Sequence, residues 1–104
     1  MTSSLFSRRW QVVKVASEQL EFRGISVGHL GMYFEELGGK QITEGFPIVY
    51  QGENWSGEIL GEEEISFTSV FKVNAVLIRF TAEDGTDLDE LIKRYRYKTT
   101  RIGG

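Results

Sequence analysis

The sequence has no cysteine, one histidine and one proline, and these shortages exclude several kinds of site. A chain without cysteine forms no disulfide, no thiolate nucleophile and no cysteine-ligated zinc centre, which suits a reducing compartment. A single histidine cannot build a histidine-rich metal cluster. No apolar run approaches the ~20 residues of a membrane span, and the opening residues lack the apolar core of a secretory signal. We therefore expect a cytoplasmic protein with no membrane partner.

The length of 104 residues suits one domain with one hydrophobic core, so we predict a single domain over residues 1–104. The formal net charge of −3 hides an uneven distribution of charge. No acidic residue follows Glu90, while the last twelve residues hold five of the twelve basic residues: Lys93, Arg94, Arg96, Lys98 and Arg101. The chain combines an acidic body with a cationic C-terminal strip.

The first half of the sequence predicts a β-hairpin followed by a helix. Two β-rich runs, 8–16 and 20–27, are separated by three polar residues that we interpret as the hairpin turn. From Ser26 onward the apolar residues recur with the helical period, Ser26 can cap the first turn, and Gly38 supplies a left-handed stop. We predict a helix over 27–37.

The second half predicts four antiparallel strands, near 46–51, 55–60, 64–69 and 71–81, with turns at 52–54 and 61–63. The last strand is apolar on both sides, so we expect cover on both faces. One cover is helical, and a second copy of the protein is the candidate for the other.

The closing segment predicts an amphipathic helix over about 86–97. Thr86 is the expected N-cap, with Asp89 in the position of a capping box, and basic residues follow in the last turn. Leu91 and Tyr95 belong to its apolar stripe. We expect a few extended residues after this helix.

The predicted order is β(β)-α-β-β-β-β-α, which makes the chain an α+β protein with an antiparallel sheet. This order resembles the two-layer sandwich of the TATA-binding protein. It also resembles the small accessory domain found fused behind MoaD-type carriers in some molybdopterin-linked proteins. The resemblance rests on the order of helices and strands and extends over most of the chain. It implies a non-enzymatic binding module that is linked to molybdopterin or sulfur-carrier pathways.

The Gly103-Gly104 end resembles the tail of MoaD-type and ubiquitin-like carriers, whose terminal carboxylate is adenylated. Glycine permits such a tail to thread an active-site tunnel because it has no side chain. In those carriers the glycine pair follows a buried strand, whereas a helix is predicted shortly before it here. A carrier with Gly103 and Gly104 as its working tail is an alternative function.

Two groups of residues are candidates for binding. The cationic strip is interleaved with tyrosines, which is typical of a docking surface for an acidic protein or for nucleic acid. The pI near 5.2 disfavours nucleic acid, because an acidic molecule repels it at long range. Tyr50 and Trp55, in the loop region after Pro47, could hold an apolar ligand or pack in the core.

Three weaker motifs have structural explanations that are simpler than a functional one. Gly28 and Gly31 match the Gly-x-x-Gly loop of KH domains but carry no basic residue between them. His29 has no triad partner at a suitable spacing, and the acidic run 62–64 is typical of a solvated turn. Phosphate-loop, dinucleotide and nucleophile-elbow motifs are absent from the sequence. We therefore expect no catalytic residue, metal or cofactor, and a partner that is another protein or a second copy.

Overall fold

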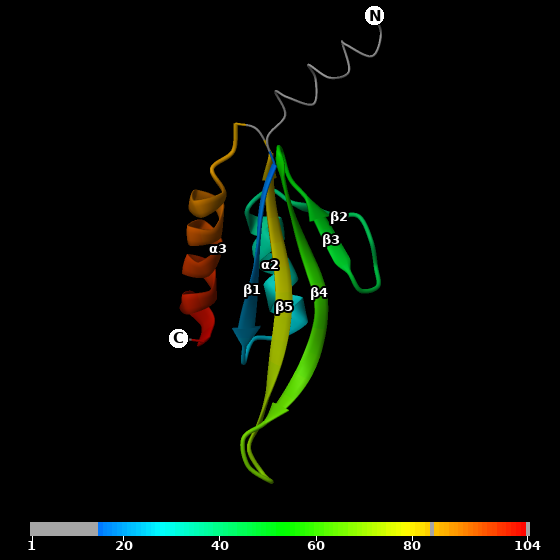
Figure 1. Ribbon diagram of the computed structural model, residues 1–104, viewed down its shortest axis with the longest axis vertical. Helices are drawn as coiled ribbons and strands as arrows, with labels where there is room; N and C mark the ends of the chain where they lie inside the picture. The colour runs from blue at the N-terminus through cyan, green and yellow to red at the C-terminus, as the bar shows by residue number, and fades with distance from the viewer. Residues whose placement is uncertain (1–14, 84, 104) are drawn as a thin grey trace, which may run out of the picture.

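The computed structural model describes residues 15–83 and 85–103 and contains a five-stranded antiparallel sheet with two helices (Figure 1). The strand order in the sheet is β1-β5-β4-β3-β2. The predicted α+β class and the antiparallel, two-layered arrangement are confirmed. The elements in chain order are β1 Val15–Arg23, α2 Val27–Glu36, β2 Lys40–Gln41, β3 Ile48–Gln51, β4 Trp55–Ser66, β5 Lys72–Glu83 and α3 Leu88–Gly103.

Both helices pack on one face of the sheet, and aromatic rings fill the space between the layers. Phe34 of α2 lies at the centre, with the ring of Tyr95 from α3 at a centroid distance of 4.4 Å. The rings of Tyr50, Trp55 and Phe80 lie 5.3–5.9 Å from Phe34. Because these rings come from α2, α3 and three strands, one cluster joins the two layers.

The predicted helix 27–37 is confirmed as α2. The Ser26 side chain accepts a hydrogen bond from the backbone N–H of His29 at 3.1 Å, as expected of an N-cap. Gly38 has a positive φ of 99° and follows the end of the helix.

Within the described residues, no helix is long and apolar enough to cross a membrane.

The predicted hairpin turn at 17–19 is wrong, because β1 passes straight through these residues. Ser17, Glu18 and Gln19 pair with Thr81, Phe80 and Arg79 of β5. Unbroken pairing with β5 holds this polar stretch in an edge strand, so its polarity reflects exposure and not a turn. The first run of the predicted hairpin, up to residue 14, lies outside the described residues.

The predicted turn at 61–63 is also wrong, and with it the separation of two strands at 55–60 and 64–69. β4 is one twelve-residue strand that pairs with β5 as far as Ser66. The only irregularity in this ladder is between Ile59 and Gly61, where the register shifts as in a β-bulge. The count of four strands after α2 is nevertheless correct, because the two-residue β2 was not predicted.

The closing helix begins and ends later than predicted. Asp87, and not Thr86, caps it, since the Asp87 carboxylate accepts from the backbone N–H groups of Asp89 and Glu90 at 3.0 and 3.3 Å. The expected extended end is wrong, because α3 continues to Gly103. The Thr99 and Thr100 hydroxyls donate to the carbonyls of Arg96 and Tyr97, three residues earlier, and so are accommodated within the helix.

The two longest strands extend beyond the rest of the sheet. β3 pairs with β4 only from Ser56 to Ile59, and β1 pairs with β5 from Ala75 onward. Residues 60–77 therefore form a projection, here called the β4–β5 arm, which points away from both helices at the bottom of Figure 1. Over these residues β4 has no neighbouring strand on its outer side.

Candidate docking groove on the closing helix

The apolar side of α3 is fixed against the rest of the fold. Leu91, Ile92 and Tyr95 are buried. The Tyr95 hydroxyl donates a hydrogen bond of 2.6 Å to the backbone carbonyl of Leu30 in α2. Burial raises the pKa of this hydroxyl far above its ordinary value, and the neighbouring hydroxyls of Tyr33 and Tyr50 add to the effect. The position of α3 is thus set by packing, and its other side faces solvent.

A groove lies between this solvent side of α3 and the end of α2. One part has a volume of about 330 Å³ and is lined by Leu37, Glu90, Lys93, Arg94, Tyr97 and Lys98. An adjoining part of about 240 Å³ shares Leu37, Glu90 and Arg94 and reaches Trp55 and the residues around the α3 N-cap. We call the two parts together the α3 groove.

The groove has an apolar floor and a cationic wall. Lys93 and Arg94 are exposed, and among the described residues no ion pair within 4.0 Å involves either of them. Lys98 differs, because its Nζ lies 3.0 Å from Glu36 Oε1 in α2. Two of the five predicted cations therefore line the groove without an ion pair, and a third helps to hold α3 on α2.

Tyr97 was not singled out from the sequence, although it is 71 % exposed and lines the groove. The helical period could have found it, because Tyr97 lies four residues after Lys93 and three after Arg94. Of the remaining cations, Arg96 is exposed but lines neither part of the groove. Arg101 lies on α3, and its side chain is outside the described part of the structure.

The two aromatic candidates have different surroundings. Tyr50 is buried and stacks on Phe34, and burial raises the pKa of its hydroxyl, with the nearby Glu35 carboxylate adding to the shift. Trp55 also stacks on Phe34 while one side of it closes the end of the α3 groove. The structure thus brings Trp55 to the same groove as Lys93 and Arg94, and it places Tyr50 in the core. An apolar ligand near these rings stays a prediction.

The weaker motifs have structural roles. A Cβ at Gly31 would lie 2.1 Å from the Tyr50 hydroxyl oxygen, so this glycine allows α2 to approach β3. His29 Nδ1 lies 3.0 Å from the Ser26 hydroxyl at the start of α2. Over residues 15–83 and 85–103, no cluster of three or more histidine or acidic side chains could hold a metal ion. Gly103 is the last residue of α3, and Gly104 lies outside the described residues.

The sequence from residue 18 to residue 104 matches the family model described as archaeal MoaD-like protein. The chain belongs to this family. The match begins within β1 and includes every later element, so the MoaD-like unit contains the sheet, both helices and the α3 groove. The MoaD-related assignment made from element order is confirmed. No curated protein and no solved structure matches the chain, so the likeness to the TATA-binding protein stays a prediction.

Proposed function

We propose that this MoaD-like chain is a non-enzymatic accessory module that docks an acidic protein surface in the α3 groove. The partner would belong to a sulfur-carrier or molybdopterin pathway. The observation that carries the proposal is the exposed Tyr97 ring beside Lys93 and Arg94, above the floor formed by Leu37. Tyrosine and arginine are enriched among the residues that dominate binding energy at protein interfaces.

The charges of the groove favour a protein partner over a nucleic acid. Glu90 lies in the middle of the groove and is shared by both of its parts. A polyanionic backbone would meet this carboxylate, as well as the net negative charge of the chain. A protein surface can avoid both repulsions. It would place acidic residues opposite Lys93 and Arg94, and an apolar or basic residue opposite Glu90.

The carrier function is the alternative, and it makes a different demand on the chain. Adenylation needs a thin extended tail, whereas Gly103 belongs to α3. This placement favours docking over transfer, because the last turns of the helix would have to unwind first. If the chain is a carrier, mass spectrometry of protein isolated from its native cells should find a thiocarboxylate at Gly104, and deletion of Gly103 and Gly104 should abolish the modification.

A capture experiment with single charge reversals tests the docking proposal. Tagged wild-type chain is used to capture partners from native cell extract, and the captured protein is then purified and its affinity measured by calorimetry. We expect Lys93→Glu and Arg94→Glu each to weaken binding by roughly 10-fold to 100-fold, since both oppose an acidic surface. Lys40→Glu makes the same charge change on β2, where the side chain is exposed, and should leave affinity nearly unchanged.

Two outcomes would overturn this proposal. The first is a partner whose affinity is weakened by Lys40→Glu as much as by Lys93→Glu and Arg94→Glu, which would mean that net charge alone matters. The second is binding of a single-stranded oligonucleotide that falls steeply with salt and depends on Lys93 and Arg94, which would favour the nucleic-acid alternative.

A further inference from the structure

The β4–β5 arm has one polar and one apolar face. On the side that faces the helices, Asn74 donates to the carbonyl of Ile25 at 2.7 Å and to Glu62 Oε2 at 3.0 Å. Lys72 Nζ lies 3.9 Å from Glu64 Oε1 on the same side. Polar groups on this side therefore have partners within the chain.

The other face of the arm is mostly apolar, with Glu63 across from Ala75, and is not covered by either helix. Cross-strand pairing places Ile65 beside Val73, while Leu77 and Ala75 continue the stripe along β5. Because side chains alternate along a strand, this stripe lies on the face of the sheet opposite to Val76 and the aromatic core. Leu77 is 39 % exposed, Ile65 and Val73 are partly exposed, and Ala75 is buried. Beyond Ala75 the arm has only two strands, and because a two-stranded ribbon is marginally stable in water by itself, this stripe favours a partner.

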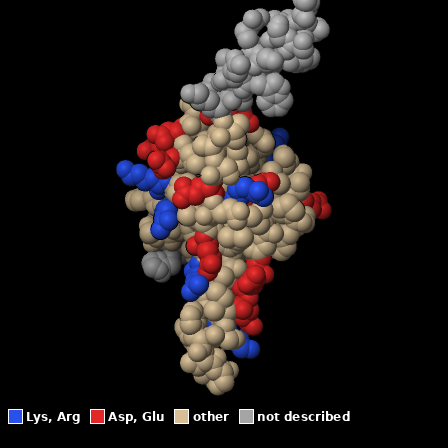
Figure 2. All heavy atoms as spheres, in the orientation of Figure 1, with Lys and Arg blue, Asp and Glu red and all other residues tan. Residues whose placement is uncertain are grey.

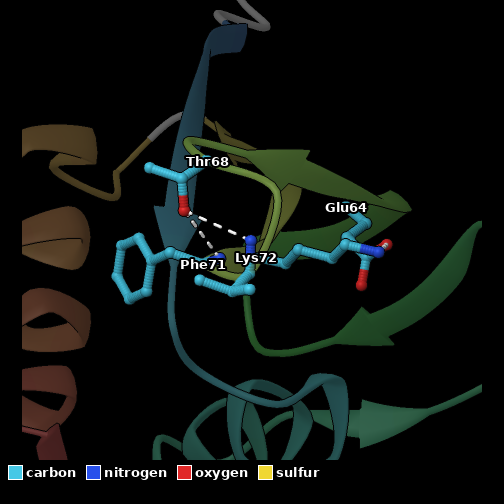
Figure 3. A network of polar contacts seen from close by, with 5 residues as sticks. Glu64, Thr68, Phe71 and Lys72 are labelled. Carbon is cyan, nitrogen blue, oxygen red and sulfur yellow. Dashed lines mark hydrogen bonds and ion pairs between the residues drawn. The ribbon is translucent and has the colours of Figure 1, made fainter.

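The tip of the arm is an apolar knob. Phe67 and Phe71 lie across from each other with ring centroids 5.5 Å apart, and the backbone N–H of Phe67 donates to the Phe71 carbonyl at 2.9 Å. The Thr68 hydroxyl accepts from the backbone N–H groups of Val70 and Phe71, as the dashed lines in Figure 3 show. The loop is thus held by its own hydrogen bonds while Val70 is 90 % exposed.

A groove of about 400 Å³ lies at the base of the same arm. Leu60, Ile65, Ala75 and Leu77 provide its apolar lining, and Glu21, Glu62 and Glu63 provide acidic groups, of which Glu21 is paired with Arg23. Figure 2 shows the uncharged tip of the arm below both acidic and basic residues. The only basic residue among the last few residues of the arm is Lys72, which is half exposed and only loosely paired with Glu64.

We propose that this arm is a self-association surface, in which the Phe67–Phe71 tip of one copy fills the groove at the base of the arm of a second copy. Knob and groove lie on one element, so a twofold axis makes two equivalent contacts and closes the assembly at a dimer. Glu62 and Glu63 at the groove would repel an anionic lipid surface or a nucleic acid. The groove therefore favours an uncharged apolar occupant, such as the tip of a second copy.

The exposed area is sufficient for this contact. Half of each phenylalanine, most of Val70 and over a third of Leu77 are exposed, which gives on the order of 400 Å² of apolar surface per copy. Two copies would bury about 800 Å² of apolar area, close to the apolar share of a standard-size interface. The surface is on the sheet face opposite to α3, so its occupation leaves the α3 groove open.

Sedimentation velocity over a concentration series reaching several hundred micromolar tests the proposal. The wild type should show a reversible dimer. Val70→Asp should weaken dimerisation by roughly 100-fold or more, because an apolar side chain is lost from two symmetry-related contacts at once. Ile42→Asp is the matched control, since Ile42 is another exposed aliphatic residue that lies next to β2.

A cross-linking measurement fixes the arrangement independently of folding effects. Because the chain has no cysteine, Val70→Cys and Leu60→Cys chains with tags of different size can be mixed under mild oxidation. A mixed disulfide should form much faster in this pair than when Val70→Cys is mixed with Ile42→Cys. A wild type that stays monomeric, a dimer unaffected by Val70→Asp, or equal cross-linking of the two pairs would overturn the proposal. So would a monomer that binds phosphatidylcholine vesicles through Val70.

Discussion

Adding one methyl group at Gly57 should be costly. It lies on β4 facing the helices, and a Cβ built there would be 2.2 Å from both Cε1 and Cζ of Phe34. Ordinary contact begins at about 3.4 Å, so the Phe34 ring would have to shift by more than 1 Å. The ring cannot shift alone, because it is fully buried and packed against four other aromatic rings.

We therefore expect Gly57→Ala to lower the free energy of unfolding by about 3 kcal/mol, the upper part of the range for an overpacked core. For a domain of this size the melting temperature should fall by roughly 10–25 °C. Urea titration followed by circular dichroism measures the change. Gly61→Ala on the same strand is the matched control, since nothing lies within 4 Å of its added Cβ.

The steric cause can be separated from strand propensity with a double variant. Phe34→Leu removes the ring that the new methyl group would strike, so Gly57→Ala should cost much less in a Phe34→Leu background than in the wild type. An equal urea midpoint for Gly57→Ala and Gly61→Ala would refute the reasoning. So would additive effects in the double variant, since the clash would then have no part in the loss.

Further predictions concern the attachment and start of α3. Tyr95→Phe removes the buried hydrogen bond to Leu30 and should cost about 1–2 kcal/mol in urea unfolding. Burial raises the pKa of Tyr95 in the folded protein, so above a pH of about 10 the unfolded chain loses this proton while the folded chain keeps it. The free energy of unfolding therefore falls as the pH rises further, and Tyr95→Phe should reduce this fall. A pH titration of the melting temperature would show it. Asp87→Ala removes the cap of Asp89 and Glu90 and should cost about 1 kcal/mol, whereas Asp87→Asn should retain most of the stability.

The helices were largely predictable because their signals are local. The apolar period, Ser26 and Gly38 are all within the segment that becomes α2, and the structure ends this helix within one residue of the prediction. The end of α3 was missed because the two β-branched threonines suggest extended structure. Their hydroxyl hydrogen bonds to carbonyls within the helix cannot be read from composition.

The strand boundaries were harder because their causes are not local. The polar residues at 17–19 stay in a strand since β5, 60 or more residues away, supplies the ladder partners. The glycine and acidic residues near 61–63 suggest a turn, but they form a bulge and an exposed strand. The groove around Lys93 and Arg94 depends on Leu37 at the end of α2 and on Trp55 from β4, so no local pattern could have assembled it.

The position of Trp55 gives the protein a built-in optical reporter. Its indole contacts the central Phe34 ring on one side and the end of the α3 groove on the other. Its fluorescence therefore responds both to loss of the packed interior and to a partner that expels water from the groove. With Trp10, which lies outside the described residues, replaced by phenylalanine, emission from this one indole can follow unfolding and docking in the same cuvette.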